Sequence, residues 1–362
     1  MQTIKAAVCH EFGTPLTIED VSLRGPEMGE VQVDMEAVAI CHSDISFIDG
    51  GWGGSLPAVY GHEAAGRVSA VGPGVTDLTV GDTVIVTLIR ACGQCASCGG
   101  GKPNSCETPY DGDHGPLKTE DGGKLHQAMA CGAFAEVVVV DQSQVVRIPE
   151  TMSMESACLL SCGVITGVGA VVNVANLRAG QDVVVIGAGG VGLNAIQGAH
   201  IAGARRIVAV DMNEEKLAIA KGFGATDGVL ATDDKPWRAA KNAIGRGADA
   251  VIVSVGAIPV YDQAPKYLAN GGKIIMMGMP HVGAVASYEP VNFAAASQGM
   301  LGSKMGDTVI KRDIPWMIDL YEQGRLKLDE LISGRWTLDQ INEAIADTKA
   351  GNASRNVILF GK

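Results

Sequence analysis

Residues 183–192 read VVVIGAGGVG, an apolar run of strand length that leads directly into the pattern G-x-G-x-x-G. The helical pattern of residues 191–202 follows without a break. Strand, glycine turn and helix in this order predict a dinucleotide site, because phosphates can approach the free N–H groups at the helix N-terminus. The alternative is a Gly-rich turn that holds no ligand. We expect the cofactor to contact five residues of the turn: Gly187, Gly189, Gly190, Val191 and Gly192.

Asp211 closes the next apolar run, 19 residues after Gly192. A carboxylate at this place accepts hydrogen bonds from both hydroxyls of the adenosine ribose and repels a 2′-phosphate. Met212 and Asn213 follow it, so no arginine favours the phosphate. The sequence therefore predicts NAD rather than NADP. Lys216 either reaches the ribose or is an exposed helix lysine.

The residues around this motif alternate between apolar runs and helical stretches. The runs span 207–210, 250–253 and 273–277, and the helical stretches span 214–223 and 261–268. Strands that are apolar on both faces are typical of a parallel sheet covered by helices. We therefore predict an α/β, doubly wound domain in this part of the chain.

The first 150 residues have a different character. Short strand patterns at 31–39, 65–71, 83–88 and 134–140 are broken by Gly, Pro and Asp, which predicts a β-rich domain. The polar segment 107–129 is expected to form a surface excursion. The final run, 356–360, reads NVILF and is expected to be a strand that returns to this first domain.

Composition restricts the possible partners and the compartment. A length of 362 residues favours two domains, and a formal net charge of −12 disfavours nucleic acid and anionic membranes as partners. We find neither an apolar stretch long enough for a membrane span nor a secretory leader in residues 1–10. We therefore expect a cytoplasmic protein, in which nine cysteines indicate metal binding rather than disulfides.

Four of these cysteines form the run C-x2-C-x2-C-x7-C. Four thiolates this close together can enclose one zinc ion in a tetrahedral, closed site. Disulfides are the alternative, which the expected reducing compartment disfavours. The sequence predicts a structural zinc held by Cys92, Cys95, Cys98 and Cys106.

A second, open metal site is indicated by three short segments. Cys41-His42-Ser43-Asp44, Gly61-His62-Glu63 and Ser161-Cys162-Gly163 all carry metal-ligating side chains. A catalytic zinc needs three protein ligands and one open position, which Cys41, His62 and Cys162 would provide. Spacing alone leaves two alternatives: His62 as a core histidine, and Cys158 as the ligand in place of Cys162.

The motifs together resemble the zinc-containing alcohol dehydrogenase family of the medium-chain dehydrogenase/reductase superfamily. The resemblance rests on 61–72 (GHE-x2-G followed by Gly72), 41–44, 162–167 (CG-x2-TG), the four-cysteine run and the nucleotide fingerprint, all in the family's order. It implies a GroES-like catalytic domain, 1–163 completed by 304–362, around a Rossmann NAD-binding domain, 164–303. It also implies a homo-oligomer, either dimer or tetramer.

The resemblance also implies roles for individual residues. Cys41, His62 and Cys162 would bind the catalytic zinc, with Glu63 beside it as a transient ligand, and Asp44 would orient His62. Ser43 would accept the proton of the alcohol, whose zinc-bound alkoxide then transfers hydride to NAD. The residues expected at the cofactor, besides those of the glycine turn, are His42, Thr166, Asp211, Lys216, Val255, Met279 and Arg355.

Two positions depart from the best-known pattern of that family. Ser46 stands where a histidine ends the proton relay, and because serine stores no proton near neutral pH, we predict proton release directly to solvent. Leu88 stands where an aromatic ring often faces the substrate. With Met279, and with Trp52 on the other wall, it predicts a pocket for alcohols bulkier than ethanol, medium-size or aryl-alkyl.

The predicted activity is the reversible, NAD-linked oxidation of such primary or secondary alcohols, which are small-molecule partners. A thiol-adduct formaldehyde dehydrogenase needs a basic subsite, for which the excursion offers only Lys118 and Lys124. A polyol dehydrogenase often lacks the four-cysteine run. A zinc-ribbon module that binds nucleic acid is disfavoured by the charge.

Overall fold

The computed structural model describes residues 1–351 and 353–361, which form two compact units. Apart from the two undescribed positions, the first unit comprises Met1–Cys162, Val309–Tyr321 and Leu328–Lys362, and the second comprises Gly163–Thr308 and Glu322–Lys327. By contacts, residues 304–308 and 322–327 thus group with the second unit. The division into folding domains at 163/164 and 303/304 stays a proposal.

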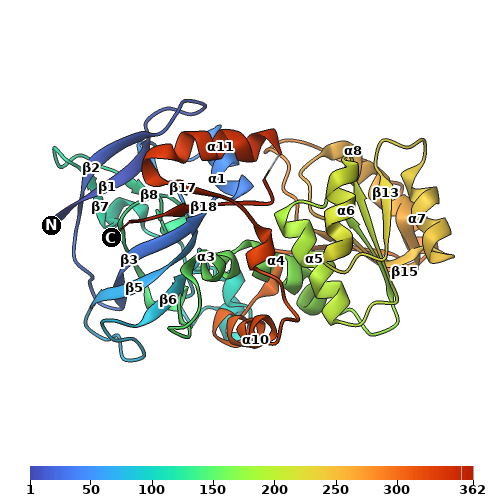
Figure 1. Ribbon diagram of the computed structural model, residues 1–362, viewed down its shortest axis with the longest axis horizontal. Helices are drawn as coiled ribbons and strands as arrows, with labels where there is room; N and C mark the ends of the chain where they lie inside the picture. The colour runs from blue at the N-terminus through green and yellow to red at the C-terminus, as the bar shows by residue number, and fades with distance from the viewer. Residues whose placement is uncertain (352, 362) are drawn as a thin grey trace. The chain divides into compact units, whose positions relative to one another are not determined.

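The first unit contains two sheets (Figure 1). One has the order β7-β2-β1-β4-β8 and the other the order β10-β6-β5-β3-β18-β17, with β9 also paired to β3. Their bounds are β1 Gln2–Cys9, β2 Thr17–Leu23, β3 Glu30–Ala39, β4 Ala58–Val59, β5 Glu63–Val71, β6 Thr83–Val86, β7 Leu117–Thr119, β8 His126–Gln127, β9 Val137–Asp141, β10 Val145–Arg147, β17 Ile332–Thr337 and β18 Arg355–Leu359.

The strand predicted at 356–360 does return to the first unit. It is β18, drawn in red in Figure 1, and it pairs antiparallel with β3 through Ile358 and Val38. Side chains of β3 alternate between buried and partly buried positions, so this strand presents one face to the core. Strand β18 thus belongs to the same sheet as β5, whose first residue is Glu63.

The segment 107–129 is ordered and adds to both ends of the five-stranded sheet. Its strand β7 pairs antiparallel with β2, and its strand β8 pairs parallel with β4. Tyr110 donates a hydrogen bond to Oε1 of Gln127 at 2.6 Å, which ties the start of the segment to its end.

The second unit is a parallel sheet of six strands in the order β13-β12-β11-β14-β15-β16. All five residues of β11 are buried, as expected for a central strand with both faces covered. The strands are β11 Asp182–Ile186, β12 Arg206–Asp211, β13 Asp227–Leu230, β14 Ala248–Val253, β15 Leu268–Met276 and β16 Gly299–Gly302. The α/β fold class and the doubly wound sheet are confirmed.

Two of the three predicted helices, 191–202 and 214–223, form within one residue of their predicted ranges. The first unit holds α1 His42–Ile48, α2 Ala96–Gly99, α3 Met154–Ala157 and α11 Ile341–Ala350, with α10 Ile310–Glu322 ending in the second unit; that unit holds α4 Gly163–Gly169, α5 Gly190–Ile201, α6 Glu214–Gly222, α7 Pro236–Ile244, α8 Ile258–Gln263 and α9 Pro290–Ala295. The helix predicted at 261–268 is wrong in its second half. Helix α8 ends at Gln263, because Pro265 cannot continue the α-helical hydrogen bonds, and a short 3-10 turn leads into β15.

Among the described residues, no single helix has the length and apolar character needed to cross a membrane. One bent pair, Met154–Ser161 with Gly163–Val174, meets those two criteria by length and composition only.

Candidate active site and metal centres

Asp44 organises the first cluster of ligands. It lies in the first turn of α1, whose N-cap residue is Cys41, and it accepts hydrogen bonds from the backbone N–H of Cys41 at 3.1 Å and of Gly61 at 3.0 Å. Its Oδ1 also lies 2.9 Å from Nδ1 of His62, and both side chains are fully buried. With Nδ1–H donating to Asp44, the other ring nitrogen of His62 is left to bind a metal.

Four metal-ligating side chains converge there. The ligand atoms of Cys41, His62, Glu63 and Cys162 lie within 4.8 Å of one another, and all four residues are buried. Nε2 of His62 and both carboxylate oxygens of Glu63 have no hydrogen-bond partner within the described part of the chain. Buried polar atoms are rarely left unpaired, so their position favours a bound cation. Two thiolates and one imidazole fit zinc, with the carboxylate beside them.

The electrostatics of the cluster also suit a cation. Burial alone would lower the pKa of His62, but the neighbouring Asp44 carboxylate outweighs it, and the pKa lies well above its usual value. A hydrogen bond from Cys162 holds the pKa of Cys41 well below its usual range, against burial, while the pKa of Cys162 is raised. One thiolate is therefore favoured before any metal binds.

Arg355, the first residue of β18, lies in the same cluster. Its Nη1 is 3.2 Å from Oε1 of Glu63, and the side chain of Arg355 is only 5% exposed. Burial raises the pKa of Glu63 to about 8, although the positive charge of Arg355 opposes the shift. No sequence pattern indicates this ion pair. The role predicted for Arg355 at the cofactor stays a prediction.

Five further residues with predicted roles at the cofactor, in the proton relay or in the pocket lie in the first unit. His42 is exposed at the first position of α1, and Ser43 and Ser46 are partly buried on the same helix. Trp52 packs edge-on against Phe47 with ring centroids 5.1 Å apart. Leu88 is partly buried after β6. Their catalytic and pocket roles stay predictions.

The four-cysteine run forms the second cluster. The Sγ atoms of Cys92, Cys95, Cys98 and Cys106 lie within 4.8 Å of one another. Backbone N–H groups point at these sulfurs: Cys95 N lies 3.3 Å from Sγ of Cys92, and Cys92 N lies 3.3 Å from Sγ of Cys106. Hydrogen bonds lower the pKa of Cys92 to about 6, and the one from Thr108 has the largest effect. The donor set fits a closed tetrahedral zinc site.

The glycine turn of the second unit has the predicted form. It connects β11 to α5, and a Cβ atom at Gly192 would lie 1.8 Å from the carbonyl oxygen of Gly187. Gly187 itself has φ +97°. Glycine is therefore required at both positions for the turn to close. Helix α5 has no side-chain cap at Gly189, so the N–H groups of its first turn could hold a phosphate.

Asp211 lies at the end of β12, where it is fixed by the glycine turn. Its Oδ2 accepts a hydrogen bond from the N–H of Ala188 at 2.7 Å, and its Oδ1 accepts one from Asn213 at 3.0 Å. Lys216 is partly buried in α6, which begins after the Asn213 cap. These contacts hold the Asp211 carboxylate next to the turn that would bind the pyrophosphate.

Three further residues predicted at the cofactor lie in the second unit. Thr166 in α4 donates to the sulfur of Met305 at 3.7 Å. Val255 is partly buried, and Met279 is 62% exposed. The chain approaches itself closely here, because a Cβ at Gly278 would lie 2.3 Å from the backbone of Val255. Their contacts with a cofactor stay predictions.

Comparison with known proteins agrees with this geometry. Residues 27–150 match the family model described as an alcohol dehydrogenase GroES-like domain, and residues 190–323 match the one described as a zinc-binding dehydrogenase. The NDMA-dependent alcohol dehydrogenase of Amycolatopsis methanolica is 35% identical, with 98% of each chain covered. The S-(hydroxymethyl)glutathione dehydrogenase of Paracoccus denitrificans is 34% identical, with 98% of this chain and 99% of that protein covered.

A solved structure extends the likeness to three dimensions. The crystal structure of benzyl alcohol dehydrogenase from Acinetobacter calcoaceticus superimposes with a TM-score of 0.94 at 30% identity, and the match covers 100% of both chains. The chain thus belongs to the zinc-containing alcohol dehydrogenase family of the medium-chain dehydrogenase/reductase superfamily, and it is an oxidoreductase. The predicted resemblance is confirmed.

Proposed function

We propose that the chain catalyses the reversible, NAD-linked oxidation of primary or secondary alcohols to aldehydes or ketones. The observation that carries the proposal is the buried cluster of Cys41, His62, Glu63 and Cys162, whose ligand atoms lie within 4.8 Å of one another. Because two thiols and one imidazole stand beside buried polar atoms that lack a hydrogen bond, this cluster suits a metal with one open position.

Several residues have separate roles around the open coordination position. A bound zinc ion would lower the pKa of the alcohol, and bound NAD would accept the hydride. Ser43, two residues after Cys41, accepts the proton of the alcohol and passes it toward Ser46 and solvent. Asp44 keeps the Nδ1 proton on His62, so that Nε2 faces the metal. Glu63 belongs to the same ligand cluster, and its Oε1 lies 3.2 Å from Nη1 of Arg355.

The choice of NAD rests on Asp211. Its carboxylate is held next to the glycine turn, where a 2′-phosphate would meet a negative charge. We propose NAD as the cofactor and two zinc ions per chain, one in each cluster. The relative from Amycolatopsis methanolica is named as NDMA-dependent, so an acceptor other than free NAD belongs in the assay.

The experiment measures NADH formation from ethanol, hexanol and benzyl alcohol, with NADP and with an artificial acceptor alongside, and zinc content in the same samples. We expect turnover with NAD, higher kcat/KM for the bulkier alcohols, and two zinc ions per chain. A pure, folded protein that holds fewer zinc ions, or that oxidises no alcohol with any acceptor, contradicts the proposal.

A thiol-adduct formaldehyde dehydrogenase is the second candidate. It is supported by the name of the Paracoccus denitrificans relative, an S-(hydroxymethyl)glutathione dehydrogenase. The excursion offers Lys118, which is exposed, and Lys124, which is already paired with Asp113. With only Lys118 available, the segment 107–129 would bind the two carboxylates of glutathione weakly. Turnover with formaldehyde plus glutathione, exceeding that with simple alcohols, would favour this candidate.

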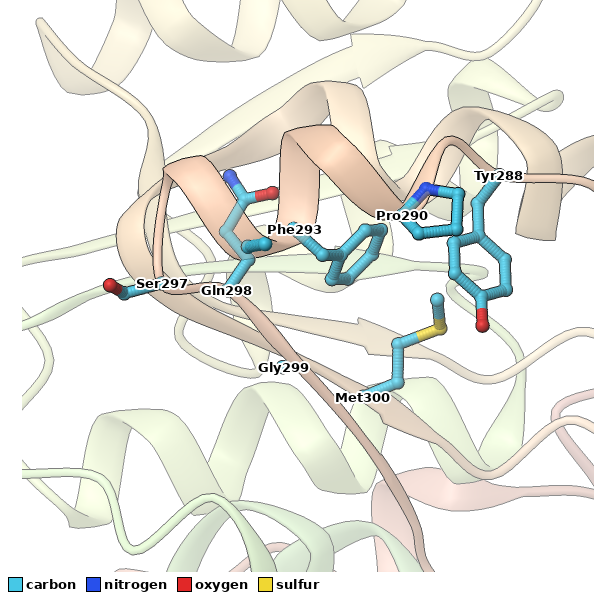
Figure 2. A pocket seen from close by; sticks show the side chains of 8 residues that line it. Tyr288, Pro290, Phe293, Ser297, Gln298, Gly299 and Met300 are labelled. Atoms are coloured by element: carbon cyan, nitrogen blue, oxygen red, sulfur yellow. The ribbon is translucent and has the colours of Figure 1, made fainter.

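We further propose a homo-oligomer whose contact edge is β16, the last strand of the parallel sheet. Apolar side chains gather beside it, with Tyr288 edge-on to Phe293 at 5.2 Å and Met300 pointing toward both rings (Figure 2). Val282, Val285 and Val291 nearby are 81%, 79% and 67% exposed. A second copy related by a two-fold axis could pair with this edge and cover this surface.

The thiol clusters also support a cytoplasmic location as part of the proposal. Both predicted zinc sites need reduced cysteines, which a reducing compartment maintains. Fractionation of the native cells, followed by immunodetection, tests this part on its own.

A further inference from the structure

Ser254 follows the last residue of β14 and lies beside the glycine turn of the second unit. Its Oγ is 2.9 Å from the carbonyl oxygen of Ile186 and 3.0 Å from that of Gly187. A hydroxyl group has one hydrogen to donate, so the two carbonyl oxygens share it. No motif in the sequence marks Ser254 as a residue of the cofactor site, yet its side chain is bonded to the turn that would bind the pyrophosphate.

The absence of side chains in the turn makes room for this hydroxyl group. A Cβ atom at Gly187 would lie 2.5 Å from Oγ of Ser254, and a Cβ atom at Gly192 would lie 3.0 Å from it. The first distance is shorter than any ordinary contact of a Cβ atom, and the second is at the limit. Two glycines of the G-x-G-x-x-G pattern therefore allow the close approach of Ser254 as well as the turn itself.

The peptide unit that joins Gly187 to Ala188 is bonded to Asp211 at its other end. The N–H of Ala188 donates to Oδ2 of Asp211 at 2.7 Å, while the carbonyl oxygen of Gly187 accepts from Ser254. These two groups point in opposite directions in a planar trans peptide, so the two side chains hold one plane from its two sides. The sheet order agrees, since β11 lies between β14 and β12, which ends at Asp211. Gly187 and Ala188 are buried, so their polar groups depend on these protein partners.

The orientation of the Asp211 carboxylate depends on this peptide. Its Oδ1 accepts a hydrogen bond from the N–H of Asn213 at 3.0 Å, and its Oδ2 accepts the one from Ala188. With both bonds in place, the carboxylate is fixed at the carboxyl end of β12, where the adenosine ribose is expected. If the peptide rotates, Oδ2 loses its donor, and the single bond to Asn213 allows the carboxylate to turn.

We propose that Ser254 is a positioning residue for cofactor selection. Its hydroxyl group fixes the peptide between Gly187 and Ala188, and through this peptide it fixes the Asp211 carboxylate that distinguishes NAD from NADP. The inference rests on the cofactor proposed above and adds a residue that acts on it through Asp211. Loss of the hydroxyl group should therefore reduce the discrimination between the two cofactors, rather than weaken the binding of both equally.

The test measures the Kd of NADH and of NADPH by fluorescence, without any alcohol, for parent protein and Ser254→Ala. We expect the Kd of NADH to rise about 5-fold, as the loss of one hydrogen bond gives, while the Kd of NADPH changes less than about 2-fold. The 2′-phosphate gains from a less fixed Asp211 carboxylate what it loses from the looser turn. The control is Thr226→Val, which removes a hydroxyl group 3.2 Å from the carbonyl oxygen of Ile207, at the opposite end of the sheet. The control should leave both Kd values unchanged.

Two further measurements keep the outcomes separate. Hydrogen exchange over residues 186–192 of the cofactor-free protein, followed by mass spectrometry, should be faster in Ser254→Ala than in parent protein and unchanged in Thr226→Val. In an Asp211→Asn background, Ser254→Ala should change the Kd of NADH less than about 2-fold, because the carboxylate through which Ser254 acts is absent.

Three results would overturn the inference: an unchanged Kd of NADH in Ser254→Ala, an equal loss of affinity for NADH and NADPH, or an effect of the same size in the Asp211→Asn background. Parent protein that binds neither cofactor, but shows the expected hydrogen exchange, contradicts the proposed NAD-linked function alone.

Discussion

At the scale of residues, one buried carboxylate fixes the geometry of the metal-ligating cluster that contains His62. Asp44 contacts the backbone on both sides of the site, at Cys41 and Gly61, and also the ring of His62. His62 lies 18 residues after Asp44 in the sequence, and the Asp44 side chain links the two ligand-bearing segments. Its removal should weaken zinc binding more than it lowers the stability of the fold.

We predict that Asp44→Asn weakens zinc binding by about 10–100-fold and lowers kcat/KM similarly. The asparagine amide is neutral, so it orients His62 less strongly than the carboxylate does. Its NH2 group would also face the N–H donors of Cys41 and Gly61. Competition with a chromogenic chelator measures the affinity. Asp34→Asn, on β3 of the same unit, serves as control. Unchanged zinc affinity in Asp44→Asn would show that the carboxylate does not orient His62.

The sequence predicted most of the residues in this cluster but could not settle all of them. Cys158 and Cys162 lie within one segment, and spacing alone left both as candidates. The structure turns Cys158 toward the carbonyl oxygen of Glu155, at 3.1 Å, and brings Cys162 to Cys41 and His62. The pair of Glu63 and Arg355 depends on β18 joining the sheet, which no local pattern reveals.

Among the secondary-structure elements, the four-cysteine lobe has little core of its own. Its helix α2 is a single turn with no buried residue, so the sulfurs and the N–H groups that face them are its main contacts. A metal ion would then supply much of the local stability.

We predict that Cys98→Ser lowers the zinc content from two ions to one per chain and increases hydrogen exchange in residues 92–106. Ser97→Ala, in the same helix, should leave the zinc content unchanged. Mass spectrometry under native conditions counts the ions. A variant that still holds two ions would mean that this cluster is not a closed site of four ligands.

The connection between β2 and β3 depends on a charge pair. Arg24 donates to both carboxylate oxygens of Glu30, at 2.5 and 2.9 Å, and both side chains are mostly buried. Burial alone would raise the pKa of Glu30, but the hydrogen bonds from Arg24 and from the N–H of Glu27 outweigh it, so the pKa is lowered.

We predict that Glu30→Gln lowers the free energy of unfolding by about 1–3 kcal/mol at neutral pH. Because the folded pKa lies below the unfolded value, the contribution is present above the unfolded pKa and is lost as pH falls through the folded one. The difference between parent and variant should therefore shrink in acid, as measured by urea unfolding. Glu27→Gln, whose side chain is 72% exposed, should cost less than about 1 kcal/mol. A difference independent of pH would contradict the assignment.

Periodicity in the sequence predicted the longer strands and helices well. It failed where a single proline ends a helix and where a strand is very short. The strand β11 and the helix α5 lie within one residue of the predicted ranges. The helix predicted at 261–268 stops early at Pro265. The pairing of β7 and β8 with the five-stranded sheet was not predicted, because both strands are very short and no periodic pattern marks them.

For the whole molecule, alternation of strands and helices predicted the parallel sheet but not the order of its strands. The edge position of β16 follows from the topology, which the chain pattern does not display. This edge, with the apolar side chains beside it, is the surface that the proposed oligomer would bury.

We predict that Leu301→Lys, at a residue of β16 that is 39% exposed, converts the native oligomer into smaller species. A charged side chain at an edge strand opposes edge-to-edge pairing. Light scattering after gel filtration gives the mass, and circular dichroism checks the fold. Val80→Lys, at a residue 65% exposed in the first unit, is the control. An unchanged mass for Leu301→Lys would assign the contact to another surface.

The short segment Glu322–Lys327 limits how the protein can be divided. Gln197 of α5 accepts a hydrogen bond from the N–H of Lys327 at 2.7 Å and donates one to its carbonyl oxygen at 3.0 Å. A fragment cut at residue 308 would lack these six residues. The buried side-chain amide of Gln197 would then lose its hydrogen-bond partner, Lys327. Recombination of the second unit between relatives should therefore exchange two pieces of chain together, and a single-crossover chimera is expected to be unstable.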